Sequence, residues 1–458
     1  MVAAALAEAA VVATNGWKGG GPAATGKAYI AGSLAAATCS LLGTAAAMPV
    51  QAQEQPEWEM DTALLYYGED GGRVQDVSLN LLARRLFPDD RILSMSLAVD
   101  SLTGATPNGA IPQDDVQTFT RPSGEDTYQV AAGDTPLDDT FLDTRYALTA
   151  SWQQPLGRNY SGSAGLSFST EYDYTHAGLN FGLSKDFNKR NTTLSLGLSL
   201  ARDEFDPVGG TPPPLGLMPD VGELPVRSAT ESKDIVDVLL GVTQVINDRF
   251  LVQFNYSLSD ASGYLNDPYK ILSVVDPSTG DAISRLPAPG LDGPLHQYRF
   301  ENRPDQRTKH SLFGQGKYFM DGKVLDVSYR FMTDDWGIDS HTLETKLNLP
   351  VGEGRFIEPH LRFYTQGEAD FYRPSLSDGE SLPQFASADY RLGNFDAFTA
   401  GLKYGWRTSS GKDYAVRLEY YRQDGEVPQG LVAGNQDRDS LYPDLDAIIL
   451  NFSFGFGL

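Results

Sequence analysis

Apolar and polar residues alternate along most of the chain after residue 53. In the closing segment "IILNFSFGFGL" (448–458), one parity holds only Ile, Leu and Phe, and from Asn451 onward the other holds Asn, Ser and Gly. The segments "SGSAGLSFST" (161–170) and "TTLSLGLSLA" (192–201) repeat this pattern. Alternate residues of a strand point to opposite faces, so each segment has one apolar face. Because no comparably strong helical period appears after residue 53, we expect an all-β chain.

The connections between these segments come in two kinds that alternate. Short turn signals occur at 88–91, 155–159, 188–191, 247–249, 321–323, 351–355 and 408–412. Long connections lie between them, at 102–139, 206–231, 261–304, 373–386 and 424–443. This sorting predicts a transmembrane antiparallel β-barrel, with short periplasmic turns and long extracellular loops. We count about 16 strands, to within two, with both chain ends on the short-turn side.

Aromatic residues lie within a few positions of every short turn, which predicts an interfacial girdle at the periplasmic rim. They are Phe87, Trp152, Phe187, Phe250, Phe319, Phe356 and Trp406. The alternating aromatics of the last strand are typical of the segment that the barrel-insertion machinery recognises. We expect Phe452, Phe454, Phe456 and Leu458 to form this membrane-insertion signal, with the apolar face of the strand against outer-membrane lipid.

An Ala/Gly-rich apolar run, 28–48, follows Lys18 and Lys27 and precedes a small-x-small site. This layout predicts a signal peptide over 1–52, cleaved after Ala52, and an outer-membrane β-barrel domain over 53–458 in a Gram-negative bacterium. Cys39, the single cysteine, lies inside the signal, so we expect no disulfide chemistry in the exported chain. A lipoprotein processed at this cysteine is the alternative.

Composition narrows the class of protein further. Charged residues make up 21% of the chain and mean hydropathy is -0.30, which excludes a polytopic helical membrane protein. The net charge is -24, and removal of residues 1–52 takes away Lys18, Lys27 and Glu8, which changes it to -25. We therefore expect no nucleic-acid partner, because a polyanion would be repelled.

If the apolar parity faces lipid, the other parity faces the lumen and carries mixed charges on three adjacent strands. The predicted lumen-lining residues are Asp326, Ser328, Arg330, Glu344, Lys346, Glu358, His360, Arg362 and Tyr364. Such charges are ordinary in a polar lumen, where they pair across strands. Two interpretations remain open: a salt-bridged wall that fixes the barrel's shape, or a site for a specific substrate or ion.

Carboxylates cluster at "TDDWGIDSH", where Asp334, Asp335 and Asp339 form an acidic outer turn near His341. The spacing is not that of a Ca²⁺ loop, so we favour a hydrogen-bonded turn and keep Ca²⁺ as a weak alternative. The five histidines show no metal-ligand spacing, so we expect no cofactor and no metal. Without a GxSxG motif we expect no enzyme, and name no catalytic residue.

The segment 206–226, "DPVGGTPPPLGLMPDVGELPV", is rich in Pro and Gly and excludes regular structure. A constriction in the lumen, a docking surface and a mobile surface loop are all open for it.

Several blocks resemble a bacterial exported β-rich family of unknown function, domain of unknown function 3570. They are 100–110, 263–276, "ENRPDQRTKHSLFGQGKYF" (301–319), "FMTDDWGIDSHTLE" (331–344) and 361–372. The family is often encoded beside an ApbE-type flavin transferase, a small lipoprotein and a thioredoxin-fold protein. The resemblance therefore implies a small lipoprotein and flavin- or thioredoxin-type periplasmic proteins as partners, and it implies no catalytic residues.

The leading hypothesis for function is an outer-membrane pore or conduit with a polar, mixed-charge lumen. The first alternative is a structural sleeve or assembly partner for an extracytoplasmic redox or flavoprotein complex. The second alternative is an outer-membrane hydrolase.

Overall fold

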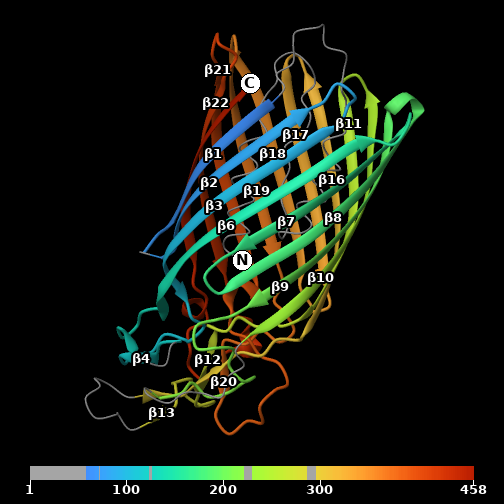
Figure 1. Cartoon of the computed structure of the whole chain (residues 1–458). Coiled ribbons are helices and arrows are strands. Elements are labelled where there is room, and N and C mark those ends of the chain that lie inside the picture. Colours follow the sequence, from blue (N-terminus) through green and yellow to red (C-terminus); the bar gives the residue numbers. More distant parts are fainter. Residues whose placement is uncertain (1–57, 72, 123–125, 221–229, 286–294, 458) are drawn as a thin grey trace.

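A computed structural model describes residues 58–71, 73–122, 126–220, 230–285 and 295–457. Within these residues, sixteen antiparallel strands close into one barrel (Figure 1). None of the short helices in this part of the chain has the length and apolar composition of a membrane-spanning helix. The barrel strands are β1 (Trp58–Glu69), β2 (Gln75–Leu86), β3 (Ile92–Pro107), β6 (Leu137–Pro155), β7 (Tyr160–Thr170), β8 (Tyr174–Phe187), β9 (Thr192–Phe205), β10 (Glu231–Asn247), β11 (Phe250–Gly263), β16 (Gln306–Met320), β17 (Lys323–Asp334), β18 (Asp339–Gly352), β19 (Arg355–Gln366), β21 (Phe395–Arg407), β22 (Asp413–Gly425) and β23 (Leu445–Gly457).

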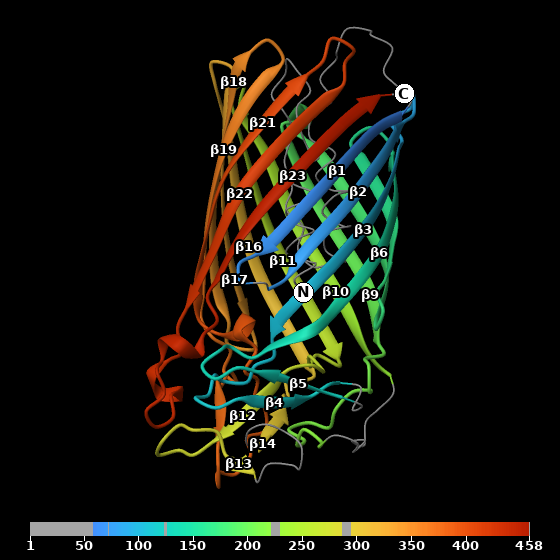
Figure 2. The same ribbon diagram turned by 90° about the vertical axis from the view of Figure 1, so that its left-hand side faces the viewer.

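The barrel closes where its last strand meets its first. β23 pairs antiparallel with β1 from Glu59↔Gly457 to Glu69↔Ala447, so neither strand is left as an open edge. The described ends of β1 and β23 lie at the same end of the barrel as the short turns (Figure 2). The predicted all-β transmembrane barrel of about 16 strands, with short and long connections at opposite ends, is confirmed.

The outward face of the wall is apolar over most of its height. On β23, Ile448, Leu450 and Phe452 are 44%, 44% and 42% exposed, while Asn451 and Ser453 on the other parity are buried. Leu, Phe, Tyr and Val occupy the corresponding outward positions of β7 to β9 and β16 to β22. Apolar side chains exposed in such a continuous band match hydrocarbon rather than water.

The described parts of five long loops fold together at the end of the barrel opposite the short turns (Figures 1 and 2). They are 108–136, 206–230, 264–305, 367–394 and 426–444, and we call their packed assembly the cap. It contains β4 (Gln117–Thr120), β5 (Thr127–Val130), β12 (Ile271–Val275), β13 (Ser284–Arg285), β14 (Leu295–His296), β15 (Tyr298–Phe300), β20 (Ser375–Ser377), η2 (Tyr390–Leu392), η3 (Gln429–Leu431) and η4 (Asp439–Leu441). β15, β12 and β20 form one sheet drawn from two loops, so the cap has tertiary structure of its own.

The girdle of aromatics differs from the prediction at two of seven positions. Phe356 and Phe319 lie on the inward parity, and Phe356 is buried, because each follows the register of polar inward residues on its strand. Trp152 and Phe187, two outward members of the predicted girdle, lie beside cations: Arg91 is 5.6 Å from the Trp152 ring, and Lys185 is 4.9 Å from the Phe187 ring. Aromatic and basic side chains together suit the polar boundary of a membrane.

Two predictions lie outside the described residues. One is the signal peptide over 1–52 with its cleavage after Ala52. The other is the place of Leu458 in the membrane-insertion signal. The insertion role of the other three aromatics stays a prediction. In the structure Phe454 stacks on Phe456 and Tyr414, with ring centroids 5.1 and 4.9 Å apart.

Candidate functional site

Inward-facing charges concentrate on β16 to β22, toward the end of the barrel that carries the short turns. We call this set the luminal belt: Lys317, Asp326, Glu344, Lys346, Glu358, His360, Lys403, Arg417 and Glu419. The strand register sets its shape, because Asp326 pairs with Lys346 and Lys346 pairs with His360 across three strands. Period-2 alternation thus places charges from distant parts of the chain side by side on one wall.

His360 is at the centre of the luminal belt. Its Nδ1 lies 2.7 Å from Glu419 Oε1, and its Nε2 lies 2.9 Å from Glu344 Oε1. Lys346 Nζ lies 2.5 Å from the same Glu344 oxygen. Arg417 reaches Glu358 at 3.5 Å and Glu419 at 3.6 Å. Each carboxylate therefore has at least one cationic or imidazole neighbour, as groups removed from water require.

The luminal belt is close to electrically neutral. Asp326 adds a fourth carboxylate and lies 3.0 Å from Lys317, so four acids face four Lys or Arg side chains and one histidine. A balanced wall of this kind does not repel solutes of either sign over long range, since opposite charges cancel beyond a few ångströms.

The remaining predicted lumen residues lie farther from the short turns on the same wall. The Arg330 guanidinium lies 5.4 Å from the Phe313 ring. Tyr364 donates a hydrogen bond to Gln366 Oε1 at 2.6 Å, and its ring lies 5.5 Å from the Phe395 ring at an interplanar angle of 36°. Arg362 pairs with Glu344 in the strand register. The structure thus brings Glu344, Lys346, Glu358 and His360 into one cluster and leaves Arg330 and Tyr364 outside it.

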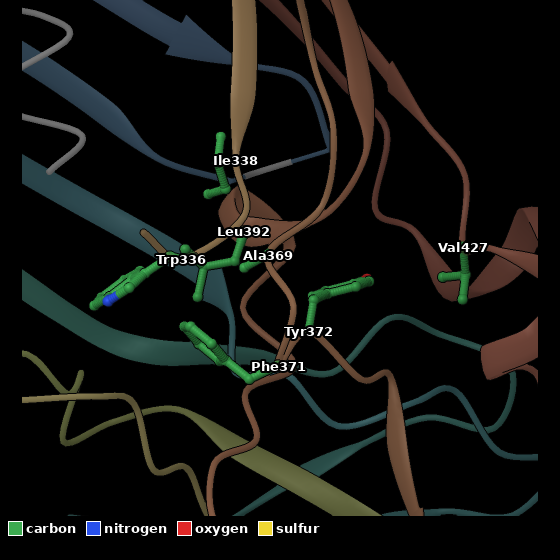
Figure 3. Packing of buried hydrophobic residues seen from close by; sticks show 7 residues of the cluster. All are labelled: Trp336, Ile338, Ala369, Phe371, Tyr372, Leu392 and Val427. Carbon is green, nitrogen blue, oxygen red and sulfur yellow. The ribbon is translucent and has the colours of Figure 1, made fainter. Parts of the chain in front are cut away.

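Hydrophobic clusters hold the cap together (Figure 3). In one of them the buried Trp336, from the turn between β17 and β18, packs edge-on against Phe371 at 5.0 Å. Val427 and Leu441 bring the last long loop to the same cluster. Another cluster joins Phe119 to residues of β12 and β15. Such burial stabilises the cap by about 25 cal/mol per Å² of apolar surface.

A buried network of charges joins loop 264–305 to loop 367–394, and we call it the ion clamp. Its charged members are Asp267, Lys270, Glu301, Arg303, Asp389 and Arg391. Arg303 Nη2 donates to Glu301 at 2.9 Å and to Asp389 at 2.8 Å. Arg391 donates to Asp389 and, at 2.8 Å, to Asp267. Three acids therefore meet three bases, and Lys270 also donates to the carbonyl of Pro107, the last residue of β3.

The electrostatics of the ion clamp favour its charged form at the centre. Burial opposes ionisation of Asp389, but Arg391 and Arg303 outweigh burial and hold the pKa of this carboxyl below its ordinary value. Burial lowers the pKa of Lys270, and burial raises the pKa of Glu301 despite the neighbouring Arg303. Arg303 and Arg391 therefore stay charged, and their positive charge influences the pKa values of the other members of the ion clamp.

The acidic outer turn is tied down by hydrogen bonds. Asp334 Oδ1 accepts from the backbone N–H of Trp336 and Ile338, and its Oδ2 lies 2.5 Å from Arg307 Nη2. Asp335 accepts from the Thr308 N–H at 2.9 Å. Asp339 begins β18. In the described ranges, no group of three or more metal-ligating side chains is placed to hold an ion.

The Pro/Gly-rich segment packs onto the cap as far as residue 220. Leu215 is buried against Leu272, and its carbonyl accepts from Arg299 at 2.7 Å. The bend residue Leu215 has a φ of 51°. Residues 221–226 of the predicted segment lie outside the described ranges.

Reasoning from sequence missed four members of the luminal belt, Lys317, Lys403, Arg417 and Glu419, and the whole ion clamp. Arg417 and Glu419 alternate with Val416 and Leu418, so the same parity rule would have found them, as it would have found Lys403 beside Leu402. The clamp had a weaker signal: its residues stand in charged, Pro- and Asn-containing loop segments, "YLNDPYK", "ENRPD" and "ADYRLGN".

Comparisons with solved structures return outer-membrane barrels with low similarity. A bacterial polysaccharide outer membrane secretin is 11% identical, with 89% of this chain and 100% of that chain covered and a TM-score of 0.41. CdiB from Acinetobacter baumannii is 10% identical, with 88% and 61% covered and a TM-score of 0.41. OccAB1 of the same organism is 11% identical, with 88% and 96% covered and a TM-score of 0.38. We take nothing about activity from likenesses of this size.

Among curated proteins, none matches the chain. A family model described as "Protein of unknown function (DUF3570)" matches residues 31–456.

Proposed function

Because the chain belongs to the DUF3570 family, whose description assigns no activity, we propose from its geometry that it is an outer-membrane pore or conduit for a polar solute. The observation that carries the proposal is the division of the barrel wall into an apolar outward face and an inward face rich in Ser, Asn, Asp, Lys and Arg. A wall with charges on its inner side suits water or a polar solute, because an apolar filling would leave those charges without solvation.

The cap controls the outer mouth in this proposal. Five loops and the ion clamp give it a packed interior, so passage of a large solute requires the cap to move or loosen. The neutral luminal belt then sets a weak ion preference near the periplasmic end.

Reconstitution into planar bilayers tests the proposal. We expect the exported chain to conduct, and a variant with a loosened cap, Arg303→Ala, to conduct more or to open more often. Absence of conductance from both proteins, under any salt or voltage, contradicts the pore.

A cross-link separates a moving cap from a fixed one. Asn302 and Ala386 are antiparallel backbone partners from two different cap loops, so their Cα atoms fall within the range that a disulfide spans. In Asn302→Cys with Ala386→Cys we expect oxidation to reduce conductance and a reductant to restore it. The same treatment of the parent chain is the control.

A structural sleeve or assembly partner is the second candidate, and the folded cap favours it. A mouth covered by a packed surface offers a platform for a small lipoprotein at the outer side of the membrane, whereas a flavin- or thioredoxin-type periplasmic protein would meet the short-turn end of the barrel. Affinity purification from native membranes distinguishes the two functions, because an assembly partner recovers a stoichiometric companion and a simple pore does not.

A further inference from the structure

Three inward side chains on β7, β8 and β9 form a chain of hydrogen-bonding groups apart from the luminal belt. Ser167 Oγ lies 3.0 Å from His176 Nε2. His176 Nδ1 lies 2.7 Å from Asp203 Oδ1. A hydroxyl nucleophile, a general base and an orienting carboxylate are hydrogen-bonded in this order in hydrolytic enzymes.

The strand register and one glycine make this arrangement. His176 stands directly opposite Asp203, and Ser167 stands opposite Gly178, two residues farther along β8. A Cβ on Gly178 would lie 2.6 Å from Ser167 Oγ and 3.1 Å from His176 Nε2. Only a residue without a side chain therefore leaves room for the serine and the imidazole to meet.

Asp203 is held firmly on its other side. Its Oδ2 lies 3.0 Å from Lys233 Nζ and accepts a hydrogen bond from the Tyr174 hydroxyl. Because an ionised carboxylate only accepts, His176 donates through Nδ1–H, and its Nε2 is the free acceptor facing Ser167. This tautomer is the one that a base for a serine hydroxyl needs.

Asn180 supplies a fourth group beside the serine. It lies on the same face of β8, opposite Gly165, and is 1% exposed. Among the described residues, neither its Oδ1 nor its Nδ2 has a hydrogen-bond partner. The Asn180 amide lies over Gly165, the inward neighbour of Ser167 on β7, because a Cβ on that glycine would lie 2.8 Å from Oδ1 and 2.9 Å from Nδ2. A buried amide without a partner is the kind of donor that stabilises an oxyanion.

We propose that Ser167, His176, Asp203 and Asn180 form an ester-hydrolysing site inside the barrel. Ser167 Oγ attacks the carbonyl carbon of an ester while His176 Nε2 takes the hydroxyl proton, and the Asn180 amide donates to the oxyanion. The C–O bond to the alcohol then breaks, and His176 returns the proton to the departing alkoxide. Water attacks the acyl-serine in the same way, which releases the carboxylic acid and restores Ser167.

The surroundings indicate the class of substrate. The inward neighbours of Ser167 across and along the strands are Thr149, Gly178, Gly165 and Ser169, none of which offers a large apolar side chain to a long acyl chain. The site lies near the outer end of β8, where Tyr269 of the cap hydrogen-bonds to Asp173 of the adjoining turn. A short acyl ester of a polar alcohol, entering from the outer mouth, fits this position.

The test uses the full exported chain refolded in detergent, a fluorophosphonate probe and p-nitrophenyl acetate. We expect a covalent adduct on Ser167 by peptide mass spectrometry. We expect acetate release to fall at least about 100-fold in Ser167→Ala and His176→Gln, and in Gly178→Ala, which displaces the serine from the imidazole. Ser163→Ala, a serine on the same face of β7 without a histidine contact, keeps the parent rate.

Asp203 is a positioning residue, since it acts through His176. Asp203→Asn should lower kcat while KM stays within about twofold, and heat-modified electrophoretic mobility checks that the barrel still folds. No adduct in the parent chain, an adduct on Ser169 instead, or equal esterase rates in the parent and Ser167→Ala overturns the proposal. The pore proposal is unaffected by such a result, because conductance does not depend on Ser167.

Discussion

At the scale of single residues, Arg303 shows that a buried charge needs partners of opposite charge. Its guanidinium bridges Glu301 and Asp389, and all three side chains are almost fully buried. Removal of one partner from a buried ion pair leaves the other charges uncompensated, which destabilises by about 3–5 kcal/mol. Surface pairs of the same chemistry contribute about 0–1 kcal/mol.

We therefore expect Arg303→Ala to lower the free energy of cap opening by about 3 kcal/mol, so that amides of β12 and β15 exchange with solvent roughly 100-fold faster. Hydrogen exchange followed by mass spectrometry measures this. Arg373→Ala is the matched control, since Arg373 pairs with Glu380 at 3.7 Å on the surface, and it should change exchange less than fivefold. Equal effects of the two variants contradict the clamp.

The pKa of Asp389 sets the pH range over which the clamp acts. Burial alone would raise it, but Arg391 and Arg303 keep it below its ordinary value. A carboxyl with a lower pKa in the folded state stabilises above its unfolded pKa of about 3.9, and this contribution is lost as pH falls through the folded value. We expect the gap in cap-opening free energy between the parent and Asp389→Asn to stay constant from about pH 7 to 5 and to narrow only below about pH 4. Hydrogen exchange at several pH values, corrected for intrinsic rates, checks this; a gap that closes between pH 7 and 5 contradicts the depressed pKa.

At the scale of elements, the first long loop docks on β12 through a glycine. Gly109 has a φ of 99°, and a Cβ there would lie 2.4 Å from the Ile271 carbonyl oxygen. The neighbouring Asn108 carbonyl accepts from the Ile271 N–H at 2.9 Å, so loop and strand are locked together.

Gly109→Ala should therefore destabilise the cap by at least about 2 kcal/mol, since backbone strain adds to a clash with main-chain atoms that cannot rotate away. Gly133→Ala is the control: it has a φ of 81° with open space around it, and should cost about 1 kcal/mol from strain alone. Exchange rates of β12 amides measure both. If Gly133→Ala proves the more damaging variant, the docking contact is not what holds this loop.

Elements of the barrel could be predicted from sequence, and elements of the cap could not. Each barrel strand carries its own period-2 signal, and its partner is the next barrel strand along the chain, so alternation and turn length suffice. In the cap, β12 pairs in parallel with β20, about 100 residues away, and Arg391 meets Asp267 across 124 positions. No local pattern encodes such contacts. The Ser167 site was not predicted from the sequence either. The serine and His176 are nine residues apart and form no recognised sequence motif, and the turn between β7 and β8 brings them together.

At the scale of the whole molecule, the balance of charge in the luminal belt predicts ion preference. Replacement of Lys346 and Lys403 by Gln removes two of the four Lys or Arg side chains of the luminal belt, so its four carboxylates outnumber its remaining Lys and Arg side chains. We expect the double variant to become several-fold more selective for cations, because local negative potential concentrates them. Reversal potentials under a salt gradient measure the ratio. Lys185→Gln, on the outward face, should leave it unchanged, and an unchanged ratio in the double variant places the selective constriction elsewhere.

The cap also depends on a segment close to the C-terminal end of the described chain. Its Trp336 cluster is completed only by Val427 and Leu441, which precede the final strand. The core of the cap is therefore complete only when the segment immediately before the closing strand is in place. A chain that lacks the last long loop would leave the Trp336 cluster incomplete, while the clusters built from the earlier loops would keep all their members.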